Sequence, residues 1–501
     1  MRSVMIACVL LLVSQAALAT VLHVPADYPT IGAATAVAVS GDEVLVAPGT
    51  YNERIALGPG QDGVKIHSES GPSVTIIDGG FTGSVVSMTL VGPSTELIGF
   101  TITRGGHSPA LISDNGGAIQ LDRSSPKIDD DIVTRNVSWR GAVYLNQGSP
   151  SITSCVIDGN SSRVGGGIHI ATGSPVIRGN TITNNASDSG GGISAGNTTM
   201  LVIENNLFRS NQCNGGQGGG MLIISSEGVI AGNHFVSNSA GIGGGLCASS
   251  ITMQISDNVF QVNTANIGGG LALDSSSPVV ENNTFLSNSG ATAAGGIYVS
   301  SPTNLIIRGN LIQDNDCPHG SGGGIYLDQG ASATIEKNLI LRNHCVAFGG
   351  GVTIWAQSTP TLTGNTIALN RGDLGGGNVY VRGSSHLNLQ GNILSHSPQQ
   401  GLEQDDVEGP STVTLSCNDV SNNAGGNYTG LPDPTGSDGN ISSDPLFCDL
   451  MALDVHLSSV SPCATANSPA GCGLIGARDV NCEGPVRTLT TTWGGLKASY
   501  R

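Results

Sequence analysis

Charge, aromatic rings and long apolar runs are all scarce in this sequence. Charged residues make up 11% of its 501 residues and aromatic residues 4%, and 20 Lys and Arg stand against 37 Asp and Glu. The net charge of −17 argues against nucleic acid or an anionic membrane surface as a partner. The repeated region sustains no helical period, which argues against a helical bundle. With 74 glycines, the chain is suited to short strands and tight turns.

The long apolar run that does occur lies at the N-terminus. Arg2 is followed by apolar residues from Val4 to Val13 and then by the small-residue sequence Ala17–Ala19. This order is typical of a signal peptide, so we expect residues 1–19 to be removed after Ala19. No later stretch is long enough to span a bilayer, so the mature chain should have no transmembrane segment. We therefore expect a secreted protein or one held at the cell surface or envelope.

Glycines recur in a fixed pattern through most of the chain. A Gly-Gly-Gly or Gly-Gly-Ala step, followed by an aliphatic residue, returns every 24 to 28 residues. A constant period of this length indicates stacked repeats in one elongated solenoid rather than several separate domains. The aliphatic position is held by Ile119, Val143, Ile168, Ile193, Met221, Leu246, Leu271, Ile297, Ile325 and Val352, and a last copy places Asn378 there.

A second phrase, aliphatic-x-x-Asn-x-Phe/Ile-x-x-Asn, lies between the glycine steps. Its apolar and polar residues alternate over a few positions, which predicts short strands. Strands one repeat apart would lie parallel at about 4.8 Å, so equivalent side chains should stack. The stack should contain the rings of Phe208, Phe235, Phe260 and Phe285 and a ladder of shared amide hydrogen bonds. The predicted ladder residues are Asn180, Asn206, Asn233, Asn258, Asn283, Asn310, Asn338 and Asn365.

This combination of phrases resembles the right-handed parallel β-helix of the pectate-lyase-like superfamily. The step at Gly116–Ile119 and the Phe-x-x-Asn step at Phe235–Asn238 are also similar to repeats of chlamydial polymorphic outer-membrane proteins. The resemblance covers roughly residues 97–397 and implies an all-β, single-stranded solenoid of about thirteen coils. It leaves the activity open, because the superfamily includes enzymes, adhesins and passive surface proteins.

Both ends of such a solenoid need covering, because an open end exposes apolar core groups and unpaired strand edges. We expect an N-terminal helical cap at residues 20–43, with its helix from about Thr30, the N-cap, to Val39. The solenoid should then occupy residues 44–397. This opening also resembles that of pectin methylesterases, but the catalytic motifs of that family do not follow.

Beyond Ser397 the repeat is lost. Residues 398–484 resemble the closing module of bacterial secreted β-helix repeat proteins and should form a disulfide-rich C-terminal cap. Residues 485–501 form a basic tail, either disordered or a sorting tag. The sequence leaves the pairing open among the five cysteines of the closing module, which are Cys417, Cys448, Cys463, Cys472 and Cys482.

Two further cysteines, Cys317 and Cys345, occupy the same column one repeat apart. A separation near 4.8 Å falls within the Cα range of a disulfide, which we expect in an exported chain. With His319 and His344 the same cysteines could instead ligate zinc, and the oxidising compartment favours the disulfide.

Aromatic residues gather on one outward column, although the chain has few of them. Tyr298 and Tyr326 lie one residue after the aliphatic residue of successive glycine steps, and Asp328 and Trp355 lie two places further along their strands. Exposed rings beside polar groups suit stacking on sugar faces, so these four residues are candidates for glycan binding. The alternatives are a patch covered by a loop, or the preference of aromatic residues for strands.

Two acidic groups are candidates for catalysis, and each has a simpler structural interpretation. The consecutive residues Asp129–Asp131 place only Asp131 inward, in the asparagine column. Glu281 and Arg308 lie one coil apart on an outward column, which is typical of an exposed ion pair. Polygalacturonase-like signatures are absent. We therefore predict no catalytic residues.

We accordingly predict an exported, non-catalytic β-helix of scaffold or adhesin type, a monomer that contacts a polysaccharide or a cell-surface component. The alternative is a polysaccharide lyase or glycoside hydrolase acting on pectin-like or other acidic glycans. We expect no cofactor and no metal. Calcium is the alternative at the turn that contains Asp433 and Asp438, where the spacing of an EF-hand is missing.

Overall fold

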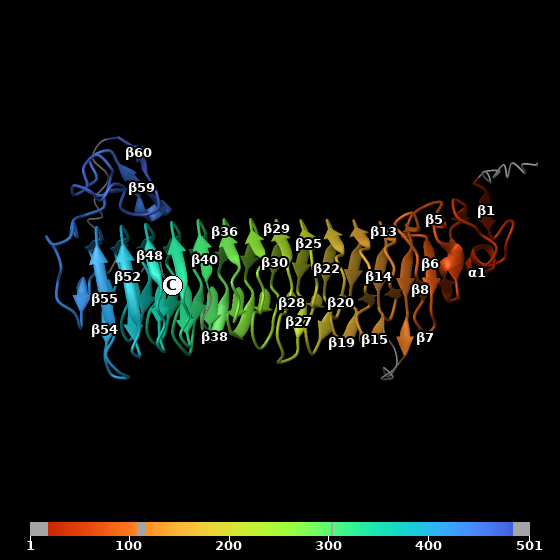
Figure 1. Cartoon of the computed structure of the whole chain (residues 1–501), viewed down its shortest axis with the longest axis horizontal. Helices are drawn as coiled ribbons and strands as arrows, with labels where there is room; N and C mark the ends of the chain where they lie inside the picture. The colour runs from red at the N-terminus through yellow and green to blue at the C-terminus, as the bar shows by residue number, and fades with distance from the viewer. Residues whose placement is uncertain (1–18, 108–115, 302–303, 484–501) are drawn as a thin grey trace, which may run out of the picture.

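The computed structural model describes residues 19–107, 116–301 and 304–483 as an elongated right-handed parallel β-helix (Figure 1). Over these residues, sheet A has sixteen strands, from β1 (Val21–Val24) to β55 (Thr412–Ser416), and sheets B and C have fifteen each. Apart from Ala19, the predicted signal peptide lies outside the described residues, as does the tail at 485–501. In the part of the chain that is described, no helix is long and apolar enough to cross a membrane.

Each coil is a succession of very short strands separated by tight turns. In one coil, β36 (Val279–Glu281) lies in sheet A, β37 (Thr284–Leu286) in sheet B and β39 (Ile297–Ser300) in sheet C. A left-handed residue, Asn282 with φ 55°, makes the turn between β36 and β37. Before β39, Gly296 lets neighbouring coils approach closely, because a Cβ there would lie 2.5 Å from the Gly324 carbonyl oxygen.

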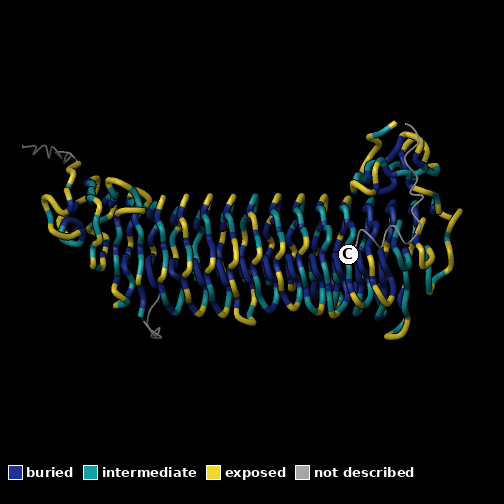
Figure 2. The backbone as a smooth tube through the Cα atoms, turned by 180° about the vertical axis from the view of Figure 1, so that it is seen from behind, coloured by how far each residue is buried: buried dark blue, intermediate teal, exposed yellow. Residues whose placement is uncertain are grey.

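The predicted core stacks are confirmed. The rings of Phe208, Phe235, Phe260 and Phe285 are parallel, with successive centroids 4.7, 4.8 and 4.7 Å apart. All eight predicted ladder asparagines donate from Nδ2 to the side-chain oxygen of the equivalent asparagine one coil further on. Figure 2 shows buried residues recurring in every coil along the rod. The ladder also extends beyond its predicted members to Asn392, Asn418 and Asn440.

The expected count of about thirteen coils is too low. At the start, β1 already pairs with β2 (Glu43–Val46), and these first coils lack the glycine step by which repeats were counted. At the end, β54 (Leu402–Asp405) and β55 continue sheets C and A after the last glycine step. Parallel pairing requires inward apolar residues at the right positions, whereas the glycine step is needed only where coils approach most closely.

The N-terminal helix is shorter than expected. Helix α1 covers Ile31–Thr35, and its N-cap is Thr30, whose side chain accepts a hydrogen bond from the Ala33 N–H. The Glu53 carboxylate accepts from the first helical amides, at Ile31 and Gly32. Two β-branched residues follow the helix, Val37 and Val39, and such residues have weak helix propensity.

The C-terminal module lies beside the rod and does not close its end (Figure 1). Its strands are β58 (Phe447–Asp449), β59 (Asp454–Ser458) and β60 (Val480–Cys482). Within the described residues two disulfides form: Cys448–Cys482 inside the module and Cys417–Cys472 between the module and the last coils. Cys463 keeps a free thiol. The packing joins outward residues of sheet B, Leu341, Ala368 and Ile393, to module residues Phe447, Leu457 and Ile475.

Candidate functional site

The predicted aromatic residues form a row on the outward face of sheet C. Tyr298 on β39 pairs in register with Tyr326 on β43 (Ile325–Asp328), and their ring centroids are 5.8 Å apart. Trp355 follows β47 (Val352–Ile354), and its ring stacks on that of Tyr326 at 6.4 Å and 16°. The side chains of all three are partly exposed. We call Tyr298, Tyr326 and Trp355 the ring row.

The fourth predicted residue, Asp328, lies beside this row. One of its carboxylate oxygens accepts a hydrogen bond from the Tyr298 hydroxyl at 3.1 Å. Burial raises the pKa of the Tyr298 and Tyr326 hydroxyls, and the negative charge of Asp328 adds to the effect. Both tyrosines therefore stay neutral, and the hydroxyl hydrogen of Tyr298 is the one donated to Asp328.

The sequence prediction missed two residues that hold Trp355 in place. The Arg382 guanidinium lies over the Trp355 ring, 4.7 Å from its centroid. The Trp355 Nε1–H donates to a Glu408 carboxylate oxygen at 2.7 Å, and Arg382 pairs with the same carboxylate at 3.2 Å. A ring fixed on one face and at its edge loses little conformational entropy on binding a ligand.

Arg382 was missed because the last glycine step was placed one residue out of register. Val352 pairs with Val379 rather than with Asn378, which takes the place of a third glycine. In the correct register, Tyr380 and Arg382 on β51 (Val379–Arg382) fall into the same two columns as Tyr326 and Asp328. Asn378 joins the interior instead, where it hydrogen-bonds to Asn370 and Asn423.

Tyr380 is fully buried and lies beside the end of the ring row, in the outward column of Tyr326. Its ring stacks on Phe348 at 4.6 Å, and its hydroxyl donates to the Asp405 carboxylate at 2.5 Å. Burial would raise the pKa of Asp405, but the Tyr380 hydroxyl, the Val407 amide and Arg382 outweigh it and hold that pKa below its usual value. Asp405 is therefore a firmly ionised anchor for Arg382.

Glu403 is the remaining carboxylate on β54 that faces this side. One of its oxygens accepts from the Gly376 N–H at 2.7 Å, and burial raises its pKa. The site thus combines flat rings, neutral hydroxyls and several carboxylates on one rigid sheet. Such a surface can stack on sugar faces and accept hydrogen bonds from hydroxyl or amino groups.

The expected disulfide between Cys317 and Cys345 is not formed. The two residues pair in register on β42 (Asp316–Cys317) and β46 (His344–Cys345), but both are buried free thiols. In-register parallel strands keep the two Cα–Cβ bonds parallel, whereas a disulfide needs them to converge. Among the described residues, no group of three or more His, Cys, Asp or Glu side chains is placed so that it could hold a metal ion.

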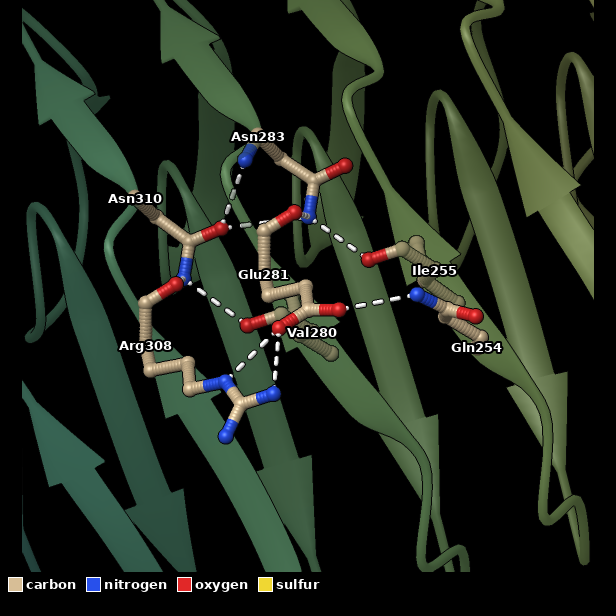
Figure 3. Close-up of polar contacts among 7 residues, drawn as sticks. All are labelled: Gln254, Ile255, Val280, Glu281, Asn283, Arg308 and Asn310. Atoms are coloured by element: carbon tan, nitrogen blue, oxygen red, sulfur yellow. Dashed lines mark hydrogen bonds and ion pairs between the residues drawn. The ribbon is translucent and has the colours of Figure 1, made fainter.

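The charged column of sheet A is a set of structural ion pairs (Figure 3). One Glu281 carboxylate oxygen accepts from the Arg308 guanidinium at 2.6 Å, and the other accepts from the Gln254 side-chain amide at 2.8 Å. Asn283, which is buried two residues after Glu281, donates to the Ile255 carbonyl and to the Asn310 side-chain oxygen. Side chains on the two neighbouring strands thus bind both Glu281 oxygens, so Glu281 links three adjacent coils at the surface.

The remaining acidic candidates also have structural roles. Asp131 lies inside the asparagine column, where it accepts from the Phe100 N–H at 2.7 Å. Asp129 pairs with Lys127 and accepts from the Thr153 hydroxyl. In the turn proposed above for calcium, Asp433 accepts from the Thr435 N–H, and calcium binding there stays a prediction.

A family comparison now identifies the architecture. The family model described as the right handed beta helix region matches residues 58–208, 111–260, 142–310 and 218–367, which together cover most of the chain. The chain belongs to this family. The comparison with curated proteins found no match. The similarity of its repeats to those of chlamydial outer-membrane proteins stays a prediction.

Several solved structures are similar to this chain over most of its length. The catalytic domain of a GH87 α-1,3-glucanase in complex with nigerose is 14% identical, with a TM-score of 0.35 and coverage of 80% of this chain and 68% of that one. The periplasmic alginate epimerase AlgG is 13% identical, with a TM-score of 0.31 and coverage of 80% and 76%. The PL6 family alginate lyase AlyGC is 9% identical, with a TM-score of 0.30 and coverage of 85% and 80%. These similarities concern the fold alone.

Proposed function

We propose that this chain is an extracellular, non-catalytic β-helix that binds a polysaccharide along the ring row of sheet C. The observation that carries the proposal is the row itself: three partly exposed rings on successive coils, beside Asp328. Rings stack on the apolar faces of sugars, while carboxylates accept hydrogen bonds from their hydroxyls. Because the coils are fixed by continuous backbone pairing, an extended polymer could contact several rings without ordering the protein.

An extracellular location is supported by the cysteine chemistry of the C-terminal module. Its two disulfides are typical of proteins that fold in an oxidising compartment. The predicted signal peptide agrees with this location. A scaffold or adhesin role follows if the bound polymer belongs to a matrix or to a cell surface.

A non-catalytic role is supported by how the nearby carboxylates are engaged. Asp405 is held by Tyr380 and Arg382, and Glu403 by the Gly376 amide. Glycoside hydrolysis needs one carboxylic acid and one carboxylate poised on either side of a sugar linkage. A lyase or hydrolase acting on acidic glycans remains the second candidate, because Glu403 and Asp405 share one face of β54 and have pKa values shifted in opposite directions.

Affinity electrophoresis of the mature protein through gels containing soluble polysaccharides tests the proposal. We expect retardation in at least one gel, and replacing Trp355 by Ala should weaken binding about tenfold, since a tryptophan held in place at an interface is often an energetic hot spot. Trp139→Ala is the matched control, because Trp139 also carries an arginine over its ring, Arg163 at 4.4 Å, but lies far from the ring row.

Two results would contradict the proposal. Absence of retardation with every polymer, or equal retardation of both tryptophan variants, would remove the ring row as a binding site. New reducing or unsaturated sugar ends in the same incubations would show turnover and would favour the enzymatic candidate.

A further inference from the structure

The face that carries the ring row is strongly acidic. Two of its carboxylates, Asp274 and Asp328, hydrogen-bond to hydroxyl groups, to Ser300 and Tyr298 respectively, and have no ion pair among the described residues. They lie in one column, because β35 (Leu271–Asp274), β39 and β43 pair in register. The carboxylates around the ring row include Asp274, Asp328, Glu403, Asp405 and Glu408.

One cation already occupies this environment. Arg382 lies over the Trp355 ring and pairs with Glu408 at 3.2 Å and Asp405 at 3.6 Å. The chain thereby shows that a cation fits between a ring of the row and the carboxylates beside it. The attraction has two sources, the ring quadrupole and the opposite charge.

The next coils carry rings and carboxylates without an arginine. Tyr326 and Asp328 lie on β43, Tyr298 lies on β39, and Asp274 lies one coil further, on β35, with Ser300 between the two acids in their column. In the part of the chain that the structure describes, no lysine or arginine pairs with either acid. A polymer with positive charges could supply to these coils what Arg382 supplies to Trp355. A polyuronate would instead bring its own carboxylates against this face and be repelled.

From this arrangement we infer that the polysaccharide bound at the ring row carries protonated amino groups, as a polymer of amino sugars does. The inference rests on the proposed function and specifies its ligand class. The ammonium groups lie over Tyr298 and Tyr326 and pair with Asp274 and Asp328, while sugar faces stack on the rings.

Calorimetric titration with three soluble polymers of similar length tests the inference: a glucosamine polymer, its N-acetylated form and a galacturonate polymer. At a pH where the amine is protonated, the glucosamine polymer should bind about tenfold more tightly than the N-acetylated polymer. The galacturonate polymer should bind most weakly. Rising salt should reduce the preference for the amine, because the face is partly exposed to solvent.

Asp328→Asn isolates the charge, since it keeps the shape and the hydrogen bond from Tyr298. It should reduce binding of the glucosamine polymer severalfold and leave the N-acetylated polymer unaffected. The control is Asp257→Asn, in an exposed left-handed turn between sheets A and B, where asparagine is equally suited.

The outcomes separate the two proposals. Equal binding of the amine and N-acetylated polymers, or tightest binding of the galacturonate, overturns the inference and leaves polysaccharide binding at the ring row intact. Binding of none of the three polymers also overturns the inference, and the electrophoresis with the wider set of polysaccharides then decides the proposed function.

Discussion

Asn258 shows at the residue scale how the ladder holds neighbouring coils together. Its side-chain oxygen accepts from the N–H and Nδ2–H of Asn233, at 2.9 and 3.0 Å. Its Nδ2 donates to the Ile230 carbonyl and to the Asn283 side-chain oxygen, at 2.9 and 3.0 Å. The residue is buried, so each of these groups would otherwise be left without a partner away from water.

Replacing Asn258 by Leu should therefore destabilise the protein by about 2–4 kcal/mol, because donors and acceptors on the two neighbouring coils lose their partners. Chemical denaturation with the matched variant Asn266→Leu, at an exposed position on the same coil, measures the difference. Equal stability of the two variants would mean that the ladder contributes nothing measurable.

Asp131 differs from Asn258, because it places a carboxyl group in the ladder column where the other residues have an amide. One oxygen accepts from the Phe100 N–H, but the other is buried without a partner, and burial raises the pKa well above its usual value. An asparagine would accept the same hydrogen bond and could donate to a carbonyl of the preceding coil, as Asn180 does to Ile152.

Asp131→Asn should thus stabilise the protein by about 1–2 kcal/mol at neutral pH. The gain should grow as pH rises from 4, because the aspartate ionises in the unfolded chain and stays protonated in the fold. Denaturation at pH 4 and pH 8 checks both the sign and the trend. A destabilised variant at pH 8 would contradict this account.

Among structural elements, those set by the repeat could be predicted and those set by single long-range contacts could not. The strands of the central coils follow from the alternation of apolar and polar residues, and the inward residues of each coil stack on the equivalent residues of the next coil. The register at Val379 was missed because Asn378 replaces a glycine, and the sequence alone does not distinguish a substituted glycine from a shifted step. The side-on position of the C-terminal module was missed because its contacts with Ile393 and Leu341 follow no period.

The junction between the last coils and the C-terminal module contains a buried acid. Asp419, on β56 (Asp419–Ser421), accepts hydrogen bonds from the Ser443 N–H and from the Cys463 thiol at 3.2 Å. Burial raises the pKa of Asp419 to about 7. The folded state therefore holds a proton at pH values where the unfolded chain has lost it.

Stability of this junction should consequently fall as pH rises from about 4 to about 7, by up to about 1.4 kcal/mol per pH unit, and then level off. Asp419→Asn should flatten this dependence. Hydrogen exchange of β58 and β59 across this pH range, in both proteins, provides the measurement. An unchanged slope in the variant would assign the pH dependence to other groups.

On the scale of the whole molecule, the fold is a rigid, acidic rod with one face specialised near its C-terminal end. The three rings of the ring row and Asp328 could be predicted, because aromatic residues are rare in this chain and these lie on successive coils at two nearby outward positions of the repeat. Arg382, Glu408 and Asp405 could not be predicted. The sequence placed the strand of Arg382 one residue out of register, and its partners lie on β54 and in the connection after it, which belongs to no repeat.

The most direct test of polysaccharide binding at this face uses Trp355 as its own reporter. The variant Trp139→Phe/Trp493→Phe keeps Trp355 as the sole tryptophan of the chain. Its fluorescence is followed during titration with the glucosamine, N-acetylglucosamine and galacturonate polymers. The account predicts a saturable change in emission, largest for the glucosamine polymer, that Tyr326→Ala weakens. Saturable binding of a polymer with no change in Trp355 emission would contradict it.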